Sequence, residues 1–294
     1  MQFIFLFILL TLFSTVFADQ DLILEGNTTE GGLLQGKTIP GSKIWFQKQK
    51  IKISENGIFL LGFHRDEPLE SFLKIILPDG HQLEKTIKIT KREYKIQRID
   101  GLPPSKVSPR KPETLQRIKK ETALVKKARK RNDDRLDFTE QFIWPVTGPI
   151  SGVYGSQRIL NGQPRRPHYG VDIARSTGTP IVAPASGIIT LAQADMFFSG
   201  GTIMLDHGHG LTSSFLHLSK LLVKVGDTVK QGQLIAEIGA TGRVTGAHLD
   251  WRMNLFEKRI DPQLLVPPML DNLGSTNKSK KKLLNNQLSE SQYK

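Results

Sequence analysis

The stretch GAHLDWRM, residues 246–253, decides how the second half of the chain is interpreted. Its residues alternate as in a β-strand, in which successive side chains point to opposite faces of the sheet. His248, Asp250 and Arg252 would therefore share one face. A histidine beside an aspartate suits a metal site or acid–base chemistry, whereas the arginine would equally form a buried salt bridge with the aspartate. Three interpretations are open at this point: a metal centre, an altered metal centre and a salt bridge.

Length and composition restrict the classes of protein to consider. The chain has 294 residues, enough for roughly two domains with cores of their own. Its hydrophobic content of 38% and aromatic content of 7% are ordinary for a water-soluble protein. The chain has no cysteine, which excludes disulfides and thiolate chemistry. Any metal must therefore be held by His, Asp or Glu.

The first 18 residues, MQFIFLFILLTLFSTVFA, are typical of a secretory signal peptide. The apolar run from Phe3 to Phe17 is shorter than the roughly 20 residues that a membrane-spanning helix needs. Val16 and Ala18 form the small-residue pattern that predicts cleavage before Asp19. No Lys or Arg precedes the apolar run, so an uncleaved anchor is the alternative. We expect an exported protein, periplasmic or secreted, with no integral membrane span after signal removal.

The net charge of +13 is concentrated in two segments. Residues 105–135 carry 12 Lys and Arg against 4 Asp and Glu, and residues 271–294 carry 5 Lys against 2 acidic residues. Nucleic-acid-binding domains place such charge on a folded face with interleaved aromatics, and neither segment has that pattern. We therefore expect no nucleic acid partner, and a non-specific attraction to anionic envelope surfaces instead. Residues 269–294 are expected to be a disordered basic tail.

Residues 19–99 predict a small β-sandwich-like domain, because short apolar runs are separated by hairpin-turn sequences such as ENG and PDG. His64 and His81 occur there singly, and we expect them at surface or packing positions. Residues 100–136 predict a Pro-rich and basic linker, with apolar residues at helical spacing between residues 115 and 125. If the protein has an envelope-protein partner, we expect the contact in this N-terminal domain or in the basic linker.

The C-terminal region, residues 137–268, concentrates the residues that suit catalysis. Its strands are short and separated by glycines, with no long periodic helix, which favours an antiparallel β architecture. PHYGVDIA places His168 four residues before Asp172, and His217 follows in SSFLHL. One histidine–aspartate pair alone is weak evidence. The ordered series that ends at His248 and Asp250 is a stronger indication of a metal site.

These motifs resemble the lysostaphin-type (LytM-type) zinc metallopeptidases, which cut peptidoglycan peptides. The resemblance extends over residues 142–266, in the order FIWPVTGPISGVYG, HYGVDIA, GTPIVAPASGIIT, GTIMLDHGHGLTSSFLHLS, VKVGDTVKQGQLIAEIGATGRVTGAHLD and DPQLLV. It implies a mainly β protein whose C-terminal part is an antiparallel β lysostaphin-type peptidase domain. It also implies Zn²⁺ as the cofactor and peptidoglycan as the substrate and binding partner.

By this resemblance, His168 and Asp172 match the family's first two zinc ligands. His217 and His248 match two catalytic histidines that do not bind the metal but assist proton movement and stabilise the developing oxyanion. The third ligand in the family is the second histidine of a His-x-His motif, and this chain has Asp250 there. Zinc binds carboxylate oxygen at about 2.0–2.2 Å, close to its distance to histidine nitrogen, so we expect Asp250 to be the third ligand.

Arg252 leaves two interpretations of that substitution open. It would orient Asp250 if the metal is bound, or it would take Asp250 into a salt bridge and leave the metal without a third ligand. We expect an exported zinc metalloendopeptidase that hydrolyses peptide bonds, chiefly cross-links, in peptidoglycan. The alternative is a catalytically inactive relative that binds the cell wall or activates a partner hydrolase such as an amidase. A carrier domain, suggested by VKVGDTVKQGQLIAEIG, is disfavoured because the segment that follows has no lysine to modify.

Four further residues near these motifs carry predictions of their own. His207 follows a strand and is expected to brace the cleft, whereas His209 is expected to face solvent. Tyr154 and Arg158, in GVYGSQR, are expected to line the substrate groove.

Overall fold

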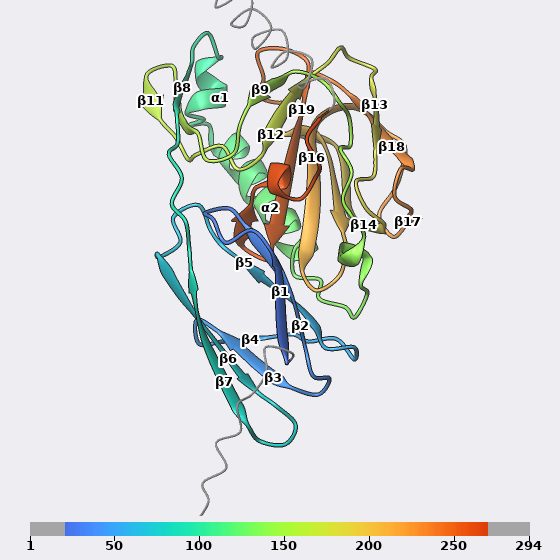
Figure 1. Cartoon of the computed structure of the whole chain (residues 1–294). Coiled ribbons are helices and arrows are strands. Elements are labelled where there is room, and N and C mark those ends of the chain that lie inside the picture. The colour runs from blue at the N-terminus through green and yellow to red at the C-terminus, as the bar shows by residue number, and fades with distance from the viewer. Residues whose placement is uncertain (1–20, 270–294) are drawn as a thin grey trace, which may run out of the picture.

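The computed structural model describes residues 21–269 as an N-terminal β-sandwich, a helical connection and a larger antiparallel sheet (Figure 1). The fold is mainly β, as the sequence predicts. In Figure 1 the sandwich lies at one end of the molecule and the large sheet at the other, with the connecting helices beside the large sheet. The expected signal peptide, residues 1–18, and the expected tail beyond residue 269 lie outside the described residues.

Seven short strands form the two layers of the sandwich. One layer has the order β1-β2-β5 and the other β4-β3-β6-β7, with antiparallel pairing throughout. Ile44, Phe59 and Ile75 are fully buried between the layers. The sequence of β6, ESFLKII, exposes and buries alternate residues, as expected for a strand with one solvated face. The strands are β1 (Leu22–Gly26), β2 (Leu33–Thr38), β3 (Lys43–Phe46), β4 (Gln49–Ile51), β5 (Ile58–Gly62), β6 (Glu70–Ile76) and β7 (Gln82–Lys88).

The strand that follows the sandwich, β8 (Ile96–Ile99), pairs with the C-terminal region instead of the sandwich. It runs parallel to β10 (Gln157–Leu160), and β11 (Gln163–Pro164) completes a small three-stranded sheet. The single-turn helix α1 (Pro104–Val107) comes next. This pairing places the connecting segment beside the loop that precedes β12, which carries part of the site described below.

The helix expected in the basic linker is α2 (Pro112–Ala128). Pro112 lies in its first turn, where a missing N–H is tolerated, and Glu113 suits the positive end of the helix dipole. Val125 and Ala128 join a small apolar cluster with side chains of the large sheet. The helix is therefore anchored to the large sheet by one narrow stripe, as its sequence predicts.

The large sheet has the strand order β17-β14-β15-β16-β19-β12-β9, with β13, β18 and β20 paired at its margins. All of its pairings are antiparallel. Its core includes Ile173, Phe215 and Trp251, each fully buried. The strands are β9 (Ile150–Gly152), β12 (Val171–Ala174), β13 (Pro180–Val182), β14 (Gly187–Met196), β15 (Gly200–Asp206), β16 (Leu211–Leu221), β17 (Thr228–Val229), β18 (Leu234–Ile238), β19 (His248–Leu255) and β20 (Lys258–Ile260), with short 3-10 helices at Asp137–Thr139 and Pro262–Leu264.

The sandwich and the large sheet share part of one core. Leu33 and Leu60 of the sandwich belong to the same hydrophobic cluster as Trp251 of β19. Arg92, just after the sandwich, donates a hydrogen bond of 2.8 Å to the carboxylate of Asp261, which is completely buried beyond β20. The two parts are therefore joined by both apolar packing and a buried ion pair.

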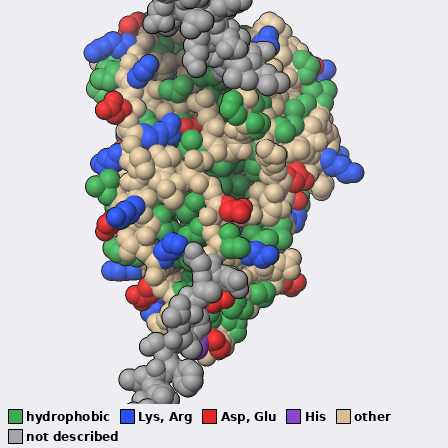
Figure 2. Space-filling model, viewed as in Figure 1, with side chains coloured by type: hydrophobic (Ala, Val, Ile, Leu, Met, Phe, Trp, Pro, Cys, Tyr) green, Lys and Arg blue, Asp and Glu red, His purple; other side chains and the backbone are tan. Residues whose placement is uncertain are grey.

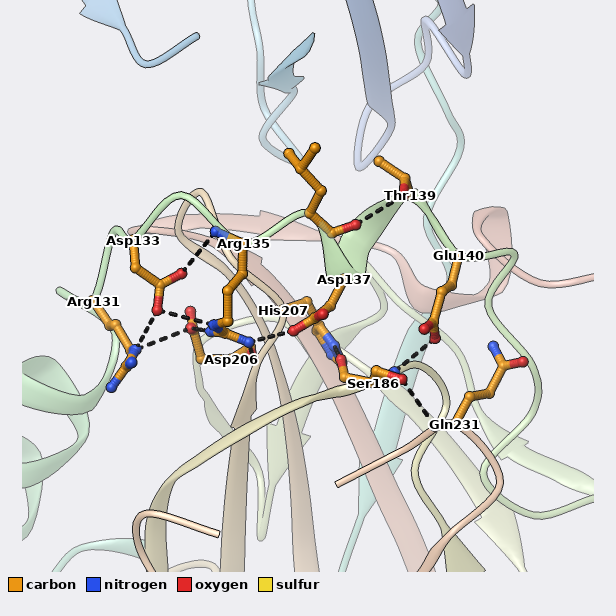
Figure 3. A network of polar contacts seen from close by, with 11 residues as sticks. Arg131, Asp133, Arg135, Asp137, Thr139, Glu140, Ser186, Asp206, His207 and Gln231 are labelled. Carbon is orange, nitrogen blue, oxygen red and sulfur yellow. Dashed lines mark hydrogen bonds and ion pairs between the residues drawn. The ribbon is translucent and has the colours of Figure 1, made fainter. Parts of the chain in front are cut away.

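A network of polar contacts fixes the segment after α2 to the edge of the large sheet (Figure 3). Arg135 forms ion pairs with Asp206, at the end of β15, and with Asp133 and Asp137. Burial raises the pKa of Asp206 to about 6, although the guanidinium of Arg135 opposes this shift. The network closes the end of the sheet opposite to the strand ends that carry the candidate site.

Figure 2 shows that Lys and Arg side chains on this face are interspersed with Asp, Glu and hydrophobic side chains. Between residues 21 and 269, no helix has both the length and the apolar character needed to cross a membrane.

Candidate metal centre

Three neighbouring strands of the large sheet bring the predicted site residues together. The register of β12 against β19 sets Asp172 directly opposite Asp250. The strand β19 begins with His248, and β16 flanks it on the other side and carries His217. His168 lies in the turn that leads into β12. All five residues predicted from the sequence thus occupy one end of the sheet.

His168, Asp172 and Asp250 form a compact buried cluster. Each offers a ligand atom, and these atoms all lie within 4.8 Å of one another. The Nε2 atom of His168 is 3.0 Å from Oδ1 of Asp172. Within residues 21–269, however, neither ring nitrogen of His168 nor Oδ1 of Asp172 has a hydrogen-bond partner. Because unsatisfied buried polar atoms are costly, this donor set has the composition and the unmet polarity expected of a metal site.

His217 and His248 face this cluster with the same ring atom. Each has its Nδ1 atom 2.9 Å from a backbone carbonyl oxygen, so Nδ1 carries the proton and Nε2 remains an acceptor. The Nε2 atom of His217 lies 3.9 Å from Asp250 Oδ2, and that of His248 lies 3.9 Å from Asp172 Oδ1. Burial lowers the pKa of His217 to about 4, although Asp250 opposes this shift, so the imidazole is neutral at pH 7.

Both carboxylates are held by an arginine. Arg252 donates from Nε to Asp250 Oδ1 at 2.9 Å and from Nη2 to Oδ2 at 2.5 Å, a two-point ion pair. Arg158 donates to Asp172 Oδ2 at 2.7 Å and leaves Oδ1 free of hydrogen bonds within the described chain. A carboxylate has about four lone-pair positions, so these contacts leave capacity for a metal. The salt bridge considered for Arg252 is present, and Asp250 remains within the cluster.

The charges of the cluster shift the pKa values of both carboxyl groups downward. Burial and then the charge of Asp250 raise the pKa of Asp172, but His168 and Arg158 outweigh them. Burial also raises the pKa of Asp250, yet Arg252 holds it well below the usual range of an aspartate. Both groups are therefore ionised at neutral pH, which is the form that binds cations.

Two glycines permit the close approach of these groups. A Cβ atom at Gly152 would lie 2.2 Å from Asp172 Oδ2. A Cβ atom at Gly170 would lie 2.7 Å from Asp250 Oδ1 and 2.6 Å from Cγ of Arg252. Any larger residue at either position would displace a carboxylate of the cluster.

Comparisons with known proteins agree with this geometry. Residues 166–262 match the family model of peptidase family M23. The chain is also similar to a crystal structure from Pseudomonas aeruginosa assigned to peptidase M23, with 30% sequence identity and a TM-score of 0.62, and the match covers 82% of this chain and 95% of that one. The chain belongs to peptidase family M23. The family resemblance seen in the sequence is thereby confirmed.

Curated relatives match the M23 region over part of their own length. A metalloprotease of Haemophilus influenzae described as uncharacterised is 39% identical over 119 residues, which is 40% of this chain and 25% of that protein. The peptidoglycan DD-endopeptidase ShyC of Vibrio cholerae is 31% identical over 150 residues, 51% of this chain and 30% of that protein. The chain thus spans about a quarter to a third of these relatives.

The site of the M23 domain opens into a cleft of about 160 Å³. Asp172, His217 and His248 line it, as predicted, and so do Gln97 of β8 and Arg243. Sequence reasoning missed the last two residues. No motif marks either, and only the pairing of β8 with β10, about 60 residues apart in the chain, brings Gln97 to the cleft.

The four remaining predictions for the M23 domain have mixed outcomes. Arg158 lines the cleft, as expected. The prediction for Tyr154 is wrong: its ring is buried and its hydroxyl donates 2.8 Å to a backbone carbonyl. The prediction that His209 faces solvent is also wrong, because its ring is buried 5.1 Å from that of Phe138. His207 is completely buried behind the sheet edge shown in Figure 3.

Proposed function

We propose that this protein is a zinc-dependent endopeptidase that hydrolyses peptide bonds, chiefly cross-links, in peptidoglycan. One observation carries the proposal: the buried cluster of His168, Asp172 and Asp250, with its unpartnered ring nitrogens and carboxylate oxygen. A structural role would leave such polarity satisfied by hydrogen bonds. Membership of peptidase family M23 supports the reaction type.

His168, Asp172 and Asp250 would hold the metal. Zinc bound by these three groups would act as a Lewis acid that polarises water and the scissile carbonyl. The donor set fits, because zinc accepts imidazole nitrogen and carboxylate oxygen in tetrahedral sites with one position open to the substrate. Arg158 and Arg252 would fix the orientation of the two carboxylates and offset their negative charge.

His217 and His248 would move protons and stabilise charge. Their Nε2 atoms point to the cluster as acceptors, since each Nδ1 proton is engaged by a backbone carbonyl. The neutral form of His217 at pH 7 suits it to accept a proton from the attacking water. A histidine that has become protonated would then donate to the leaving amine or to the oxyanion.

The substrate and location follow from relatives and from the sequence. ShyC is named a peptidoglycan DD-endopeptidase, and it shares about half of this chain. Peptidoglycan lies outside the cytoplasm, which agrees with the signal peptide expected at residues 1–18 and with a periplasmic or secreted protein. An envelope-protein partner, if there is one, would bind the N-terminal sandwich or the basic linker.

The test is metal content together with cleavage of muropeptides by the purified full chain. We expect about one zinc per chain and release of un-cross-linked peptides, with both lost in Asp250→Ala. Asp79→Ala, in an exposed turn of the sandwich, is the matched control and should retain both. A wild-type chain that neither binds zinc nor cleaves muropeptides would rule out the enzyme.

The inactive alternative rests on the two-point ion pair between Arg252 and Asp250. If that pair keeps Asp250 from the metal, the chain would bind the cell wall or stimulate a partner hydrolase such as an amidase. The distinguishing assay adds the metal-free chain to an amidase and peptidoglycan. Stimulation without zinc binding or intrinsic cleavage would establish this alternative in place of the peptidase.

A further inference from the structure

A second cavity lies beside the candidate metal centre, between α2 and the face of the sheet formed by β15, β16 and β19. Its volume is about 310 Å³. None of His168, Asp172, Asp250, His217 and His248 lines it. The cavity is therefore distinct from the proposed catalytic cleft, and its properties do not depend on the proposed activity.

Positive charge dominates the lining of this cavity. Five basic side chains line it against two acidic ones, Glu121 and Glu257. Glu121 is already engaged, because its carboxylate pairs with Arg117 at 2.6 Å and accepts the backbone N–H of Phe197 at 2.9 Å. Glu257, an exposed residue, is the one acidic side chain left for five cations.

Arg129 is the most unusual of these cations. It follows α2 directly, is only 8% exposed, and its Nε atom has no hydrogen-bond partner within residues 21–269. No ion pair of Arg129 occurs in that part of the chain. Burial lowers the pKa of Arg129 to about 9, and the charges of Arg259 and Arg252 lower it further. A buried guanidinium without an anion is strongly unfavourable, so this position calls for a negative ligand.

Other donors converge on the same space. Ser214 of β16 lines the cavity, and its buried hydroxyl has no hydrogen-bond partner within the described residues. Arg252 uses Nε and Nη2 for Asp250, and Arg259 uses Nη1 for Asn254. Because a guanidinium has five N–H donors, both arginines retain donors for a ligand in the cavity.

We propose that this cavity binds an oxyanion, a carboxylate or phosphate group carried by a small organic molecule, through Arg129, Arg252, Arg259 and Ser214. Planar guanidinium groups bind the paired oxygens of carboxylate and phosphate in two-point contacts. The ligand would supply the anion that Arg129 lacks within the chain.

The size and the apolar lining indicate a ligand larger than a bare ion. Small-molecule sites usually measure about 300–1,000 Å³, and this cavity lies at the lower end of that range. Val125, Met196, Met204 and Leu216 contribute apolar surface opposite the arginines. An acid with a short apolar part would therefore fit better than a free ion.

The test titrates the zinc-loaded full chain with inorganic phosphate and, separately, with acetate, at constant ionic strength against chloride. Binding is followed by calorimetry and by the thermal midpoint. We expect saturable binding of at least one anion, weakened at least tenfold in Arg129→Met. Arg110→Met, which removes an exposed arginine of the linker, should bind as the wild type does. Saturation by phosphate alone would identify a phosphate ligand, and saturation by acetate alone a carboxylate ligand.

Two further variants keep the test decisive. Phosphate also coordinates zinc, so His168→Ala must retain the saturable binding even though it lacks a proposed metal ligand. Arg259→Gln replaces Arg129→Met if the latter does not fold, and it should weaken binding as well. Equal, non-saturating responses in the wild type, Arg129→Met and Arg110→Met would overturn the proposal, as would loss of binding in His168→Ala alone.

Discussion

Two buried histidines of the M23 domain, His168 and His207, differ in how their ring nitrogens are satisfied. His207 has Nδ1 2.7 Å from the carbonyl oxygen of Ser186 and Nε2 2.8 Å from Oγ of Ser213. His168 is as deeply buried, but neither of its nitrogens has a hydrogen-bond partner within residues 21–269. Unmet polarity, and not burial, therefore separates the candidate metal ligand from the structural histidine.

The strongest way to break this comparison is to remove His168. We expect His168→Ala to abolish zinc binding and cleavage while leaving the metal-free fold intact, because the ring has no partner to lose. Metal analysis, a muropeptide assay and a thermal melt in chelator would measure these three properties. His64→Ala in the sandwich is the control. Full zinc occupancy in His168→Ala would contradict the proposed ligand set.

Removing a histidine that faces the cluster should have the next largest effect. We expect His217→Ala or His248→Ala to keep zinc but to lower kcat by about 10²–10⁴-fold, the usual contribution of a positioned acid or base. Steady-state kinetics with parallel zinc analysis would separate this outcome from metal loss. Unchanged kcat in both variants would remove these residues from the mechanism.

Arg252 tests whether the ion pair supports or opposes the metal centre. We expect Arg252→Met to weaken zinc affinity by about 10–100-fold, as for other groups that orient a metal ligand. Arg158→Met is the matched comparison, since Arg158 holds the other carboxylate. Competition with a zinc-binding dye would measure both affinities. Tighter zinc binding in Arg252→Met would show that the ion pair competes with the metal.

The structural histidine should affect stability and its pH dependence. Complete burial lowers the pKa of His207 to about 4 from its usual 6.5. The unfolded chain therefore binds a proton that the folded chain does not, and the free energy of unfolding should fall by about 3 kcal/mol as pH drops from 6.5 to 4. We expect His207→Gln to lose about 1–3 kcal/mol at pH 7 and much of this slope. Urea unfolding at several pH values measures both, and an unchanged slope would refute the assignment.

Much of the fold and site could be predicted because the informative signals are local. Strand alternation in residues 248–252 placed His248, Asp250 and Arg252 on one face, and the structure has them in β19 with Asp250 opposite Asp172. The helical spacing of the linker predicted α2 in the same way.

Signals that depend on distant packing were out of reach. The four residues of β8 do not indicate which strand they pair with, so Gln97 could not be placed in the cleft. His209 follows a glycine-rich turn that resembles a surface loop, yet the segment after α2 folds over it and buries its ring against Phe138. The buried, unpaired state of Arg129 likewise follows from where α2 ends on the sheet.

The ion pair between Arg92 and Asp261 has a consequence for the modularity of the chain. An M23 domain cut free of the residues before it would retain Asp261 at a buried position without its cation, and would expose the apolar surface that Leu33 and Leu60 cover. The sandwich thus acts as an intramolecular subunit of the peptidase domain: a shortened chain should melt at lower temperature in calorimetry, and domain exchange between relatives would have to carry both halves of this contact together.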